Sequence, residues 1–277
     1  MANGGIPVAG GTTNFGTLIH TNLLYAPLLR DAYGNAVERP AWTLGGTAGA
    51  AGYGAAFIRD KDPLTLYKTA PDAGEQTLTM VLSSTTRPAV YGVVLVGHNM
   101  TSTNITSAKF EGGDGNYTDV TEDLVINAAT LTPAYVLLSA AATGKDRWRI
   151  RVTYAAATEF QIGEVFLIGA APLAFARNYS WQGGIDDLEI GKMSSSGING
   201  VPRTVALWER LRKEFLFERI SETQKTALQQ AARNGSSVFS PDGASGFAHF
   251  GVFELEPPAP VMVDQFNVRA RFTEAAR

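Results

Sequence analysis

Apolar residues occur in short runs, and this spacing is the feature that most restricts how the chain can fold. Most runs are separated by Gly, Asp, Asn, Thr or Pro, and several alternate with polar residues. In RWRIRV (147–152), Trp148, Ile150 and Val152 share one side and three arginines share the other. Alternation with period two between turn-forming residues is typical of β-strands, so the sequence predicts a mainly β protein.

The predicted strands differ in how deeply they are buried. Residues 76–82 alternate, with Leu78, Met80 and Leu82 on one side, which indicates a single buried face. Residues 90–96 are apolar almost throughout, which indicates a strand that is buried more completely. Further strands are expected at 108–111, 135–138, 147–152 and 162–168, with the glycines of 112–115 supplying positive φ in a tight turn.

Two breaks in this pattern divide the chain into an arm and two domains. Residues 1–16 are rich in Gly and Thr and are expected to form a flexible N-terminal arm. Strand-like segments continue to GAAP (169–172), after which a polar, linker-like stretch begins. We therefore assign 17–172 to one domain and 173–277 to a second, smaller one.

The second domain contains the clearest helix signal. Ser221 is a good N-cap, Gln224 stands in capping-box position, and Asn234-Gly235 provides a stop, so a helix is predicted over 221–234. Residues 204–219 fit either a helical or a strand period, and their aromatic and β-branched content favours a strand. With strands at 238–239, 250–255 and 265–272, this part is expected to be a small sheet with one packed helix.

Composition and motif spacing argue against several functional classes. The 277 residues carry a formal net charge of −3 with no basic block, so we expect no nucleic-acid binding. There is no cysteine, and no apolar run approaches the roughly 18–20 residues that span a membrane. His20, His98 and His249 lack metal-site spacing, and no nucleophile motif occurs, so we expect neither enzymatic activity nor a catalytic residue.

Five segments of residues 20–170 resemble, in order, the discoidin-type, galactose-binding-like jelly roll. The resemblance implies a β-sandwich whose ligands bind at loop ends, and proteins of this fold often hold a structural Ca²⁺. The segments are the opening Asn22-Leu23, FIRDKDPLTLY (57–67), TLTMVLSSTTRPAVYGVVLVGHNM (77–100), FEGGDGNYTDV (110–120), and the closing pair RWRIRVT (147–153) and FQIGEVFLIG (160–169).

Residues 190–277 resemble a module found in tail proteins of long-tailed bacteriophages. In baseplate and distal-tail proteins this module joins rings around the tail tube, and in distal-tail proteins it usually precedes the carbohydrate-binding-like domain, the reverse of the order here. The resemblance implies a structural role. Its segments are EFLFERI (214–220), SETQKTALQQAARNG (221–235), VFSPD (238–242), FGVFELEP (250–257) and QFNVRARFTEA (265–275).

His98-Asn99 closes the apolar run 90–96, where either a binding site or a strand end could lie. Asn tolerates a left-handed backbone, and polar side chains at a strand end can satisfy backbone groups that would otherwise be buried unpaired. Because neither metal spacing nor a nucleophile motif accompanies the pair, we interpret it as a structural strand end. A ligand contact at a loop end is the alternative.

Three further groups of residues are candidates for binding. Oxygen ligands for a structural Ca²⁺ could come from Asp60, Asp62 and Asp114, although Asp-rich turns are usually solvated turns, and no other cofactor is expected. The arginine row could bind an anionic glycan or an acidic subunit, or it could face carboxylates on neighbouring strands. Candidate glycan or partner contacts are Tyr53, Tyr67 and Tyr117, in predicted loops, and Arg147, Arg149 and Arg151.

These patterns lead to two hypotheses about function. The first is a structural subunit of a phage tail tip or baseplate, located in the virion and assembled in the host cytoplasm, which joins tail tube, hub and fibres. Its partners would be other tail subunits and further copies of itself, in a trimer or hexamer. The alternative is a carbohydrate-binding module that attaches the particle to host surface glycan.

Overall fold

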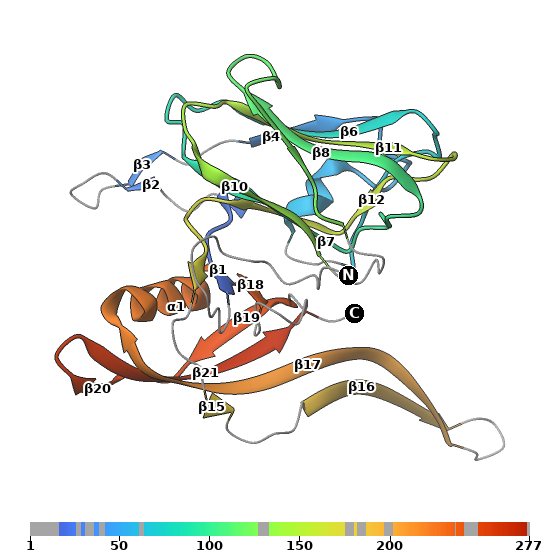
Figure 1. Ribbon diagram of the computed structural model, residues 1–277. Coiled ribbons are helices and arrows are strands. Elements are labelled where there is room, and N and C mark those ends of the chain that lie inside the picture. Colours follow the sequence, from blue (N-terminus) through green and yellow to red (C-terminus); the bar gives the residue numbers. More distant parts are fainter. Residues whose placement is uncertain are drawn as a thin grey trace.

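The computed structural model describes residues 17–25, 29–30, 36–38, 42–60, 64–126, 133–174, 180–181, 187–196, 202–235, 237–240 and 249–275. These residues form four stacked layers: a five-stranded sheet, a three-stranded sheet, a nine-stranded sheet and one helix (Figure 1). The first two layers are a jelly-roll β-sandwich, and the last two are the smaller C-terminal module. The predicted fold class, mainly β with one packed helix, is confirmed.

The two sheets of the jelly roll are antiparallel throughout. The five-stranded sheet has the order β4-β6-β11-β8-β9, and the three-stranded sheet, called here the middle sheet, has the order β10-β7-β13. The strands are β4 (Trp42–Gly46), β6 (Glu75–Leu82), β7 (Val90–Val96), β8 (Ile105–Gly113), β9 (Val120–Asp123), β10 (Ala134–Ala142), β11 (Arg147–Tyr154) and β13 (Glu164–Ile168).

Several shorter elements accompany the sandwich. One small antiparallel pair joins β5 to β12, and another joins β2 to β3. The elements are η1 (Leu23–Tyr25), β2 (Leu29–Arg30), β3 (Ala36–Glu38), η2 (Ala55–Arg59), β5 (Tyr67–Lys68) and β12 (Gln161–Ile162).

The nine-stranded sheet of the C-terminal module has the order β14-β1-β18-β19-β21-β17-β15, with β16 paired to β17 and β20 paired to β21. Helix α1 (Glu222–Asn234) packs on one face of it. The strands are β1 (Thr17–Ile19), β14 (Leu173–Ala174), β15 (Ser180–Trp181), β16 (Asp187–Ser196), β17 (Pro202–Ser221), β18 (Ser237–Ser240), β19 (His249–Leu255), β20 (Ala259–Met262) and β21 (Gln265–Glu274).

Strand β11 shows how alternation in the sequence builds the sandwich core. Its Trp148, Ile150 and Val152 are fully buried between the two sheets, and the intervening arginines lie on the outer face. The Trp148 indole covers Gly112 of the adjacent β8 so closely that a Cβ there would stand 2.3 Å from the ring. Gly112 therefore serves close packing inside a strand, and Gly115, with a φ of 70°, takes the left-handed turn position.

The middle sheet is covered on both faces. In β7, Val93 and Leu95 face the sandwich core, whereas Val94 faces the C-terminal sheet. In β13, Val165 likewise faces the sandwich and Phe166 faces the C-terminal sheet. This double coverage explains why 90–96 and 164–168 are apolar at nearly every position. In an ordinary antiparallel sheet one face is exposed to water, and apolar residues alternate with polar ones. The buried residues between middle and C-terminal sheets are Ile19, Val94, Tyr135, Phe166, Ile168, Val238 and Phe250.

Strand β1 belongs to the C-terminal sheet, where it pairs with β14 on one side and β18 on the other. Its Leu18 faces the helix-side core, and its Ile19 faces the middle sheet. The sequence-based assignment of 17–172 to the jelly roll therefore does not hold for this strand. The chain enters through the C-terminal sheet and only then passes into the sandwich; the arm 1–16 lies outside the described residues.

The side chain of Asn22 fastens this entry segment to the jelly roll. Its Nδ2 donates to the carbonyl of Val165 (2.9 Å), and its Oδ1 accepts from the backbone N–H of Leu167 (2.9 Å). The same oxygen also accepts from the N–H of Leu24 (3.1 Å). Because the amide is buried, these bonds satisfy backbone groups at the edge of β13 that water does not reach.

Helix α1 forms for the local reasons that the sequence indicates. The Ser221 hydroxyl accepts from the Gln224 N–H, and the Gln224 side chain accepts from the Ser221 N–H, which completes the predicted capping box. Gly235 ends the helix with a φ of 72°. Its Ala227, Leu228 and Ala231 are buried on the sheet.

Residues 204–219 lie in β17, which confirms the strand prediction for this segment.

The double coverage of the middle sheet predicts that the two units unfold together. We expect Phe166→Ala to lower the free energy of unfolding by about 3–5 kcal/mol, because it removes a fully buried ring from the interface. Val261→Ala, at a side chain that is 43% exposed, is expected to change it by less than about 0.5 kcal/mol. Urea titrations followed by circular dichroism and tryptophan fluorescence measure both. Two well-separated transitions in the unmodified protein would contradict this account.

Candidate functional site

Asn99 holds the end of β7 against two neighbouring segments. Its Oδ1 accepts from the Tyr154 hydroxyl (2.9 Å) and from the Gln161 N–H (3.1 Å). Its Nδ2 donates to the carbonyl of Glu159 (2.6 Å). Burial raises the pKa of Tyr154, which keeps this phenol protonated as the donor. The amide is therefore occupied with structural hydrogen bonds on both its oxygen and its nitrogen.

His98 is buried at the same strand end, with 3% of its surface exposed. Gly97 turns the chain with a φ of 67°, and the Nδ1 of His98 accepts from the backbone N–H of Met100 (3.2 Å). The imidazole thus serves the turn that follows the strand. A ligand could not reach this ring without displacing packed structure.

The arginine row lies on the outer face of the five-stranded sheet and is matched by a carboxylate on the adjacent strand. Glu111 of β8 is 3% exposed and lies 2.6 Å from Arg149 and 2.5 Å from Arg151. Burial by itself raises the pKa of Glu111, but the hydrogen bonds from both arginines outweigh it and hold the pKa below its ordinary value. The result is a buried carboxylate that is kept ionised by two cations.

The arginine row also has carboxylate partners other than Glu111. Arg151 reaches Glu75 of β6 (3.1 Å), and Arg147 pairs with Asp146 (3.1 Å). The arginines therefore form a series of ion pairs across β6, β11 and β8, which we call the ladder. This matches the alternative interpretation of the arginine row, in which it faces carboxylates on neighbouring strands. Their guanidinium groups are committed within the chain rather than gathered for an anionic ligand.

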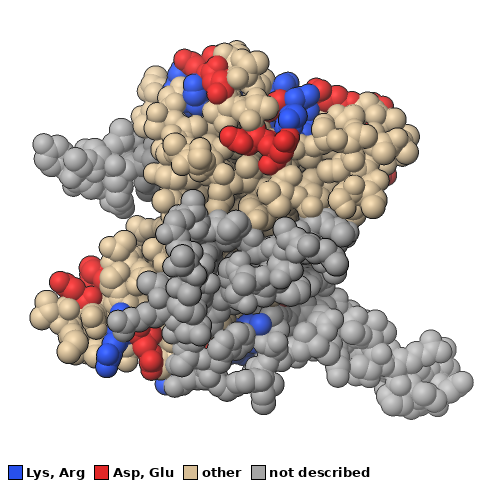
Figure 2. All heavy atoms as spheres, in the orientation of Figure 1, with Lys and Arg blue, Asp and Glu red and all other residues tan. Residues whose placement is uncertain are grey.

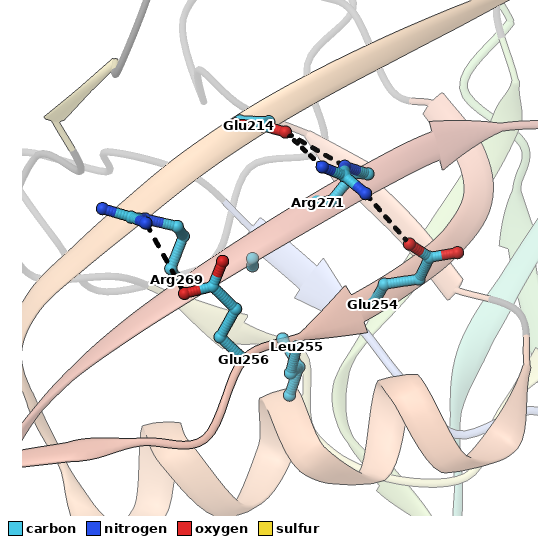
Figure 3. A pocket seen from close by; sticks show the side chains of 7 residues that line it. Glu214, Glu254, Leu255, Glu256, Arg269 and Arg271 are labelled. Carbon is cyan, nitrogen blue, oxygen red and sulfur yellow. Dashed lines mark hydrogen bonds and ion pairs between the residues drawn. The ribbon is translucent and has the colours of Figure 1, made fainter.

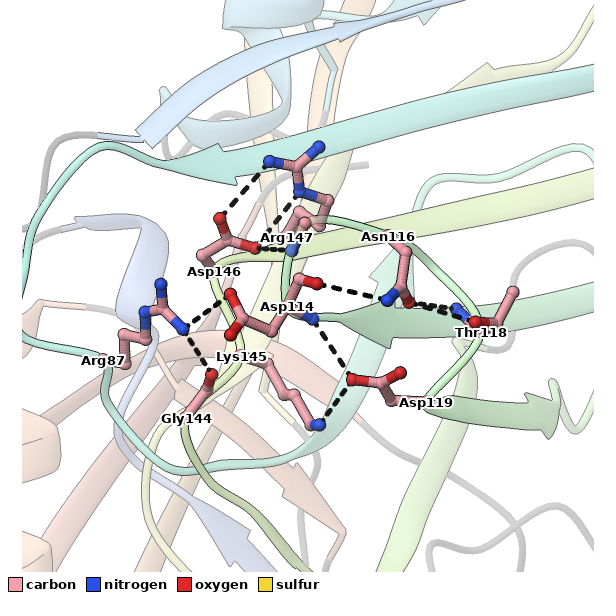
Figure 4. Close-up of polar contacts among 10 residues, drawn as sticks. Arg87, Asp114, Asn116, Thr118, Asp119, Gly144, Lys145, Asp146 and Arg147 are labelled. Carbon is pink, nitrogen blue, oxygen red and sulfur yellow. Dashed lines mark hydrogen bonds and ion pairs between the residues drawn. The ribbon is translucent and has the colours of Figure 1, made fainter.

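At the loop end beside this ladder, three turns of the jelly roll are tied together by charged side chains (Figure 4). Arg87 binds Asp114 (2.7 Å) and donates to the carbonyl of Gly144 (2.9 Å), and Lys145 binds Asp119 (2.6 Å). Hydrogen bonding from Lys145 lowers the pKa of Asp119. Acidic and basic side chains lie side by side on the face of the jelly roll seen in Figure 2, without a patch of one sign.

The two Ca²⁺ candidates that the structure describes, Asp60 and Asp114, each have a partner within the chain. Asp114 is engaged by Arg87, and Asp60 accepts a hydrogen bond from the Thr65 hydroxyl. Asp62 lies outside the described residues. Among the residues that the structure describes, no three His, Asp or Glu side chains are grouped in a way that could hold a metal ion.

The three candidate tyrosines have different environments. Tyr53 is 40% exposed in its loop, with the Lys68 ammonium 4.9 Å from the ring centroid. Tyr117 is half-buried, and the Arg149 guanidinium lies over its ring at 4.8 Å. Tyr67 is not in an exposed loop as predicted: it opens β5, is 1% exposed, and burial raises its pKa to about 12. Only Tyr53, of these three, presents an exposed ring.

Sequence reasoning did not find a cleft that lies along β10 and has a volume of about 770 Å³. Tyr91 and Glu122 contribute its aromatic and acidic parts, and Val125 on its wall is 45% exposed. Most other lining side chains are aliphatic. We call this feature the β10 cleft; its remaining lining includes Leu137, Leu138, Ala140, Ala141, Ala171 and Pro172. No motif signals it, because its residues come from four separate segments.

A second, smaller pocket of about 170 Å³ lies on the C-terminal sheet, on the face opposite α1 (Figure 3). Arg271 stands between Glu214 (2.7 Å) and Glu254 (3.7 Å), and Arg269 lies 3.6 Å from Glu256. Hydrogen bonding from Arg271 lowers the pKa of Glu214. The pocket holds three carboxylates and two guanidinium groups, and each of these carboxylates is paired with an arginine across the strands.

The β16–β17 ribbon is the most unusual feature of the C-terminal module. Residues 187–196 of β16 pair with 202–212 of β17, and β17 meets β21 only from Arg212 onward. Within the described residues, no other strand pairs with either outer edge of the ribbon over 187–196 and 202–211. Figure 1 shows the ribbon extending beyond the other layers.

At the opposite end of the same sheet, β20 and β21 form a hairpin whose end is apolar (Figure 1). Val261, Met262 and Val263 are 43%, 64% and 91% exposed, and Asp264 takes the left-handed turn position with a φ of 59°. We call these three residues the apolar tip. The run VMVD in the sequence could have signalled it, because three apolar residues directly precede a turn residue.

Comparison with known proteins gives similarity of fold only. No protein-family model and no curated protein matches the sequence. An F5/8 type C domain from Bacteroides fragilis is 21% identical, covering 47% of this chain and 93% of that chain, with a TM-score of 0.36. A chitosan-binding module from a Paenibacillus chitosanase/glucanase is 16% identical, covering 54% of this chain and 100% of that chain, with a TM-score of 0.37.

A fucolectin from the serum of striped bass, Morone saxatilis, is 10% identical and covers 85% of this chain and 92% of that chain, with a TM-score of 0.34. TM-scores this low carry no argument about a ligand, and the jelly roll is identified from its own sheets and their pairing. In the part of the chain that the structure describes, no helix has the length and apolar character needed to cross a membrane.

The ladder around Glu111 predicts a pH-dependent contribution to stability. We expect Glu111→Gln to lower the free energy of unfolding by about 2–3 kcal/mol at pH 7, because it leaves two arginines without their buried partner. Since folding lowers the pKa of Glu111, its contribution is present above the ordinary value of 4.5 and is lost as pH falls through the folded pKa.

The difference between this variant and the unmodified protein should therefore shrink below about pH 4, as measured by urea unfolding at several pH values. Asp123→Asn is the matched control, since that carboxylate forms an ion pair with Lys109 while its side chain is 80% exposed. Equal effects of the two substitutions at pH 7 would contradict the assignment of Glu111 as the centre of the ladder.

Proposed function

We propose that the protein is a non-catalytic structural subunit that assembles with other chains, and that its ribbon is a main assembly element. The observation that supports this most directly is that no described strand pairs with either outer edge of the ribbon. An isolated two-stranded ribbon is marginally stable in water, and long open edges favour pairing with another chain. A partner strand on either edge would stabilise the ribbon and would cover that edge.

The position of the ribbon also fits this role. Strand β17 has 20 residues, of which 212–221 lie within the C-terminal sheet while the first half forms the ribbon. Phe215 and Phe217 anchor the inner half in the aromatic core. A contact made at the ribbon is therefore connected through one continuous strand to the most tightly packed part of the module.

The sequence resemblance to phage tail proteins supplies the biological setting of the proposal. In that setting the subunit would form a ring or trimer in a virion's tail tip or baseplate, with other tail subunits as neighbours. The candidate residues for chemistry are consistent with a non-catalytic role. His98, Asn99 and the arginine row are engaged in hydrogen bonds and ion pairs that serve the fold.

Shortening the ribbon tests this proposal. Because Ile190 pairs with Glu209, residues 191–208 can be replaced by a two-residue Asn-Gly turn that keeps the base of the hairpin. We expect the unmodified protein to form oligomers at micromolar concentration and the shortened protein to be monomeric, as measured by light scattering after size exclusion. The two should unfold at similar temperatures.

The proposal would be contradicted if the shortened protein still formed the oligomer. It would also be contradicted if the unmodified protein were monomeric at every concentration. The matched control is Leu64→Ser, a change at an exposed residue (55%) of the jelly roll that belongs neither to the ribbon nor to the apolar tip. That variant keeps the ribbon edges and should still associate through them.

Glycan recognition by the jelly roll is a second candidate function, favoured by the exposed ring of Tyr53. An amphipathic aromatic side chain at a loop end can pack on the apolar face of a sugar while its hydroxyl stays wet. Lys68 beside the ring adds a hydrogen-bond donor, 4.9 Å from the ring centroid. In the setting proposed above, such a site would attach the particle to host surface glycan.

Tyr53→Ala tests this second function. We expect the substitution to abolish retention on immobilised glycans that hold the unmodified protein, because the stacking surface is lost. Leu64→Ala is the control, since Leu64 is also exposed (55%) and lies in a loop of the same domain. Glycan-array binding measures both variants. Absence of binding by the unmodified protein, or equal binding by Tyr53→Ala, would exclude the site.

A further inference from the structure

We propose that the apolar tip of one copy docks into the β10 cleft of a second copy, an inference that rests on the assembly proposed above. The tip and the cleft are both apolar surface features that the rest of the described chain leaves uncovered. They lie on different domains of the same molecule. A contact between them would join the C-terminal module of one copy to the jelly roll of the next.

The composition of the tip is not explained by local structure. Turn positions favour Gly, Asn, Asp, Ser and Pro, and a single exposed apolar residue needs no explanation. Here Val261, Met262 and Val263 are consecutive, and the last is 91% exposed at the turn itself. Runs of this kind on a surface are liabilities unless they meet a partner.

The tip is suited to docking by side chains rather than by strand addition. Pro260 in β20 has no N–H, so it removes a donor from the edge that another strand would need. Asp264 makes the turn compact, which leaves the three apolar side chains at the extreme end of the hairpin. Such a hairpin end fits a concave apolar surface better than it fits an open sheet edge.

The β10 cleft has the matching character. Its volume of about 770 Å³ is within the range of sites that enclose several groups, and its walls are largely aliphatic. Val125, 45% exposed, lies on the wall, and Ala140 and Pro172 line it without bulky side chains that would block entry. Burial of the tip would cover exposed apolar surface on both partners, which is the main driving force for association.

The two features belong to different copies because of where they lie. Figure 1 shows the β20 end of the C-terminal sheet well separated from β10, so the tip does not fill the cleft of its own chain. A contact between two different surfaces is heterologous, and repetition of it produces a closed ring or an open filament rather than a simple two-fold dimer. The same geometry lets every copy use both surfaces.

Cysteine cross-linking tests the contact directly, because the chain contains no cysteine. Met262→Cys and Ala140→Cys are made as separate proteins, mixed and oxidised mildly. We expect covalent one-to-one dimers from the mixture only, and a ladder of larger species from a chain that carries both substitutions. Leu64→Cys in place of Ala140→Cys is the control and should give no mixed dimer, although Leu64 is exposed (55%).

A charged tip provides an independent measurement. We expect Val263→Asp to weaken association at least about tenfold, and Leu64→Asp, the same change at another exposed apolar residue, to leave it unaltered. Thermal unfolding checks that all variants remain folded. If the Met262→Cys protein does not fold, Val263→Cys is used in its place.

The possible failures are distinguishable. Oligomers that depend on the ribbon but give no mixed cross-link would overturn the tip–cleft contact and leave the proposed assembly standing. Dimers from Met262→Cys alone, with none specific to the mixture, would show that tips meet each other and would also overturn it. An unmodified protein that is monomeric at every concentration would overturn both proposals.

Discussion

The middle sheet is the constraint on which the rest of the structure depends, because its strands β7 and β13 are buried on both faces. An antiparallel sheet usually buries one face and wets the other. Here Val93 and Leu95 pack into the sandwich while Val94 and Phe166 pack against the C-terminal sheet, so each neighbouring layer must be present for the sheet to be stable. The two domains are consequently held together by core packing rather than by a linker, and the orientation of the jelly-roll loops relative to the C-terminal module is set by that packing.

Much of this fold can be predicted from the sequence wherever local pattern and burial agree. Alternation in 147–152 predicts β11, the continuous apolar run of 90–96 predicts a deeply buried strand, and Ser221 with Gln224 predicts the helix start, because each signal lies within a few residues of the structure that it specifies. Strand β1 could not be predicted in this way. Three residues carry too little periodicity, and one of its two partners, β18, lies more than 200 residues away in the chain. Tyr67 was misplaced for the same reason, since its burial depends on distant segments.

The candidate site residues illustrate a related limit. A polar residue at the end of a buried strand has the same appearance in a sequence whether it reacts with a substrate or satisfies the backbone. Asn99 proves to do the second, as do Asn22 and Glu111 elsewhere in the fold: each makes several hydrogen bonds to groups of the same chain. The cost of leaving such groups buried and unpaired is large enough to explain their presence without any ligand. Surfaces such as the β10 cleft are assembled from separated segments, so no sequence motif indicates them.

The C-terminal sheet contains both the ribbon and the apolar tip. Strand β17 passes from the ribbon into the aromatic core, and β21, its neighbour there, leads to the hairpin that bears the apolar tip. Strand edges that no described strand covers lie at one end of this sheet, and exposed apolar side chains lie at the other. Between them, the sheet packs on one face against α1 and on the other against the middle sheet. A partner at either end would therefore act on the same stiff body, and the jelly roll would move with it. The C-terminal sheet is thus packed on both faces, whereas the ribbon edges and the apolar tip are left uncovered by the described residues, as the proposed association with neighbouring copies requires.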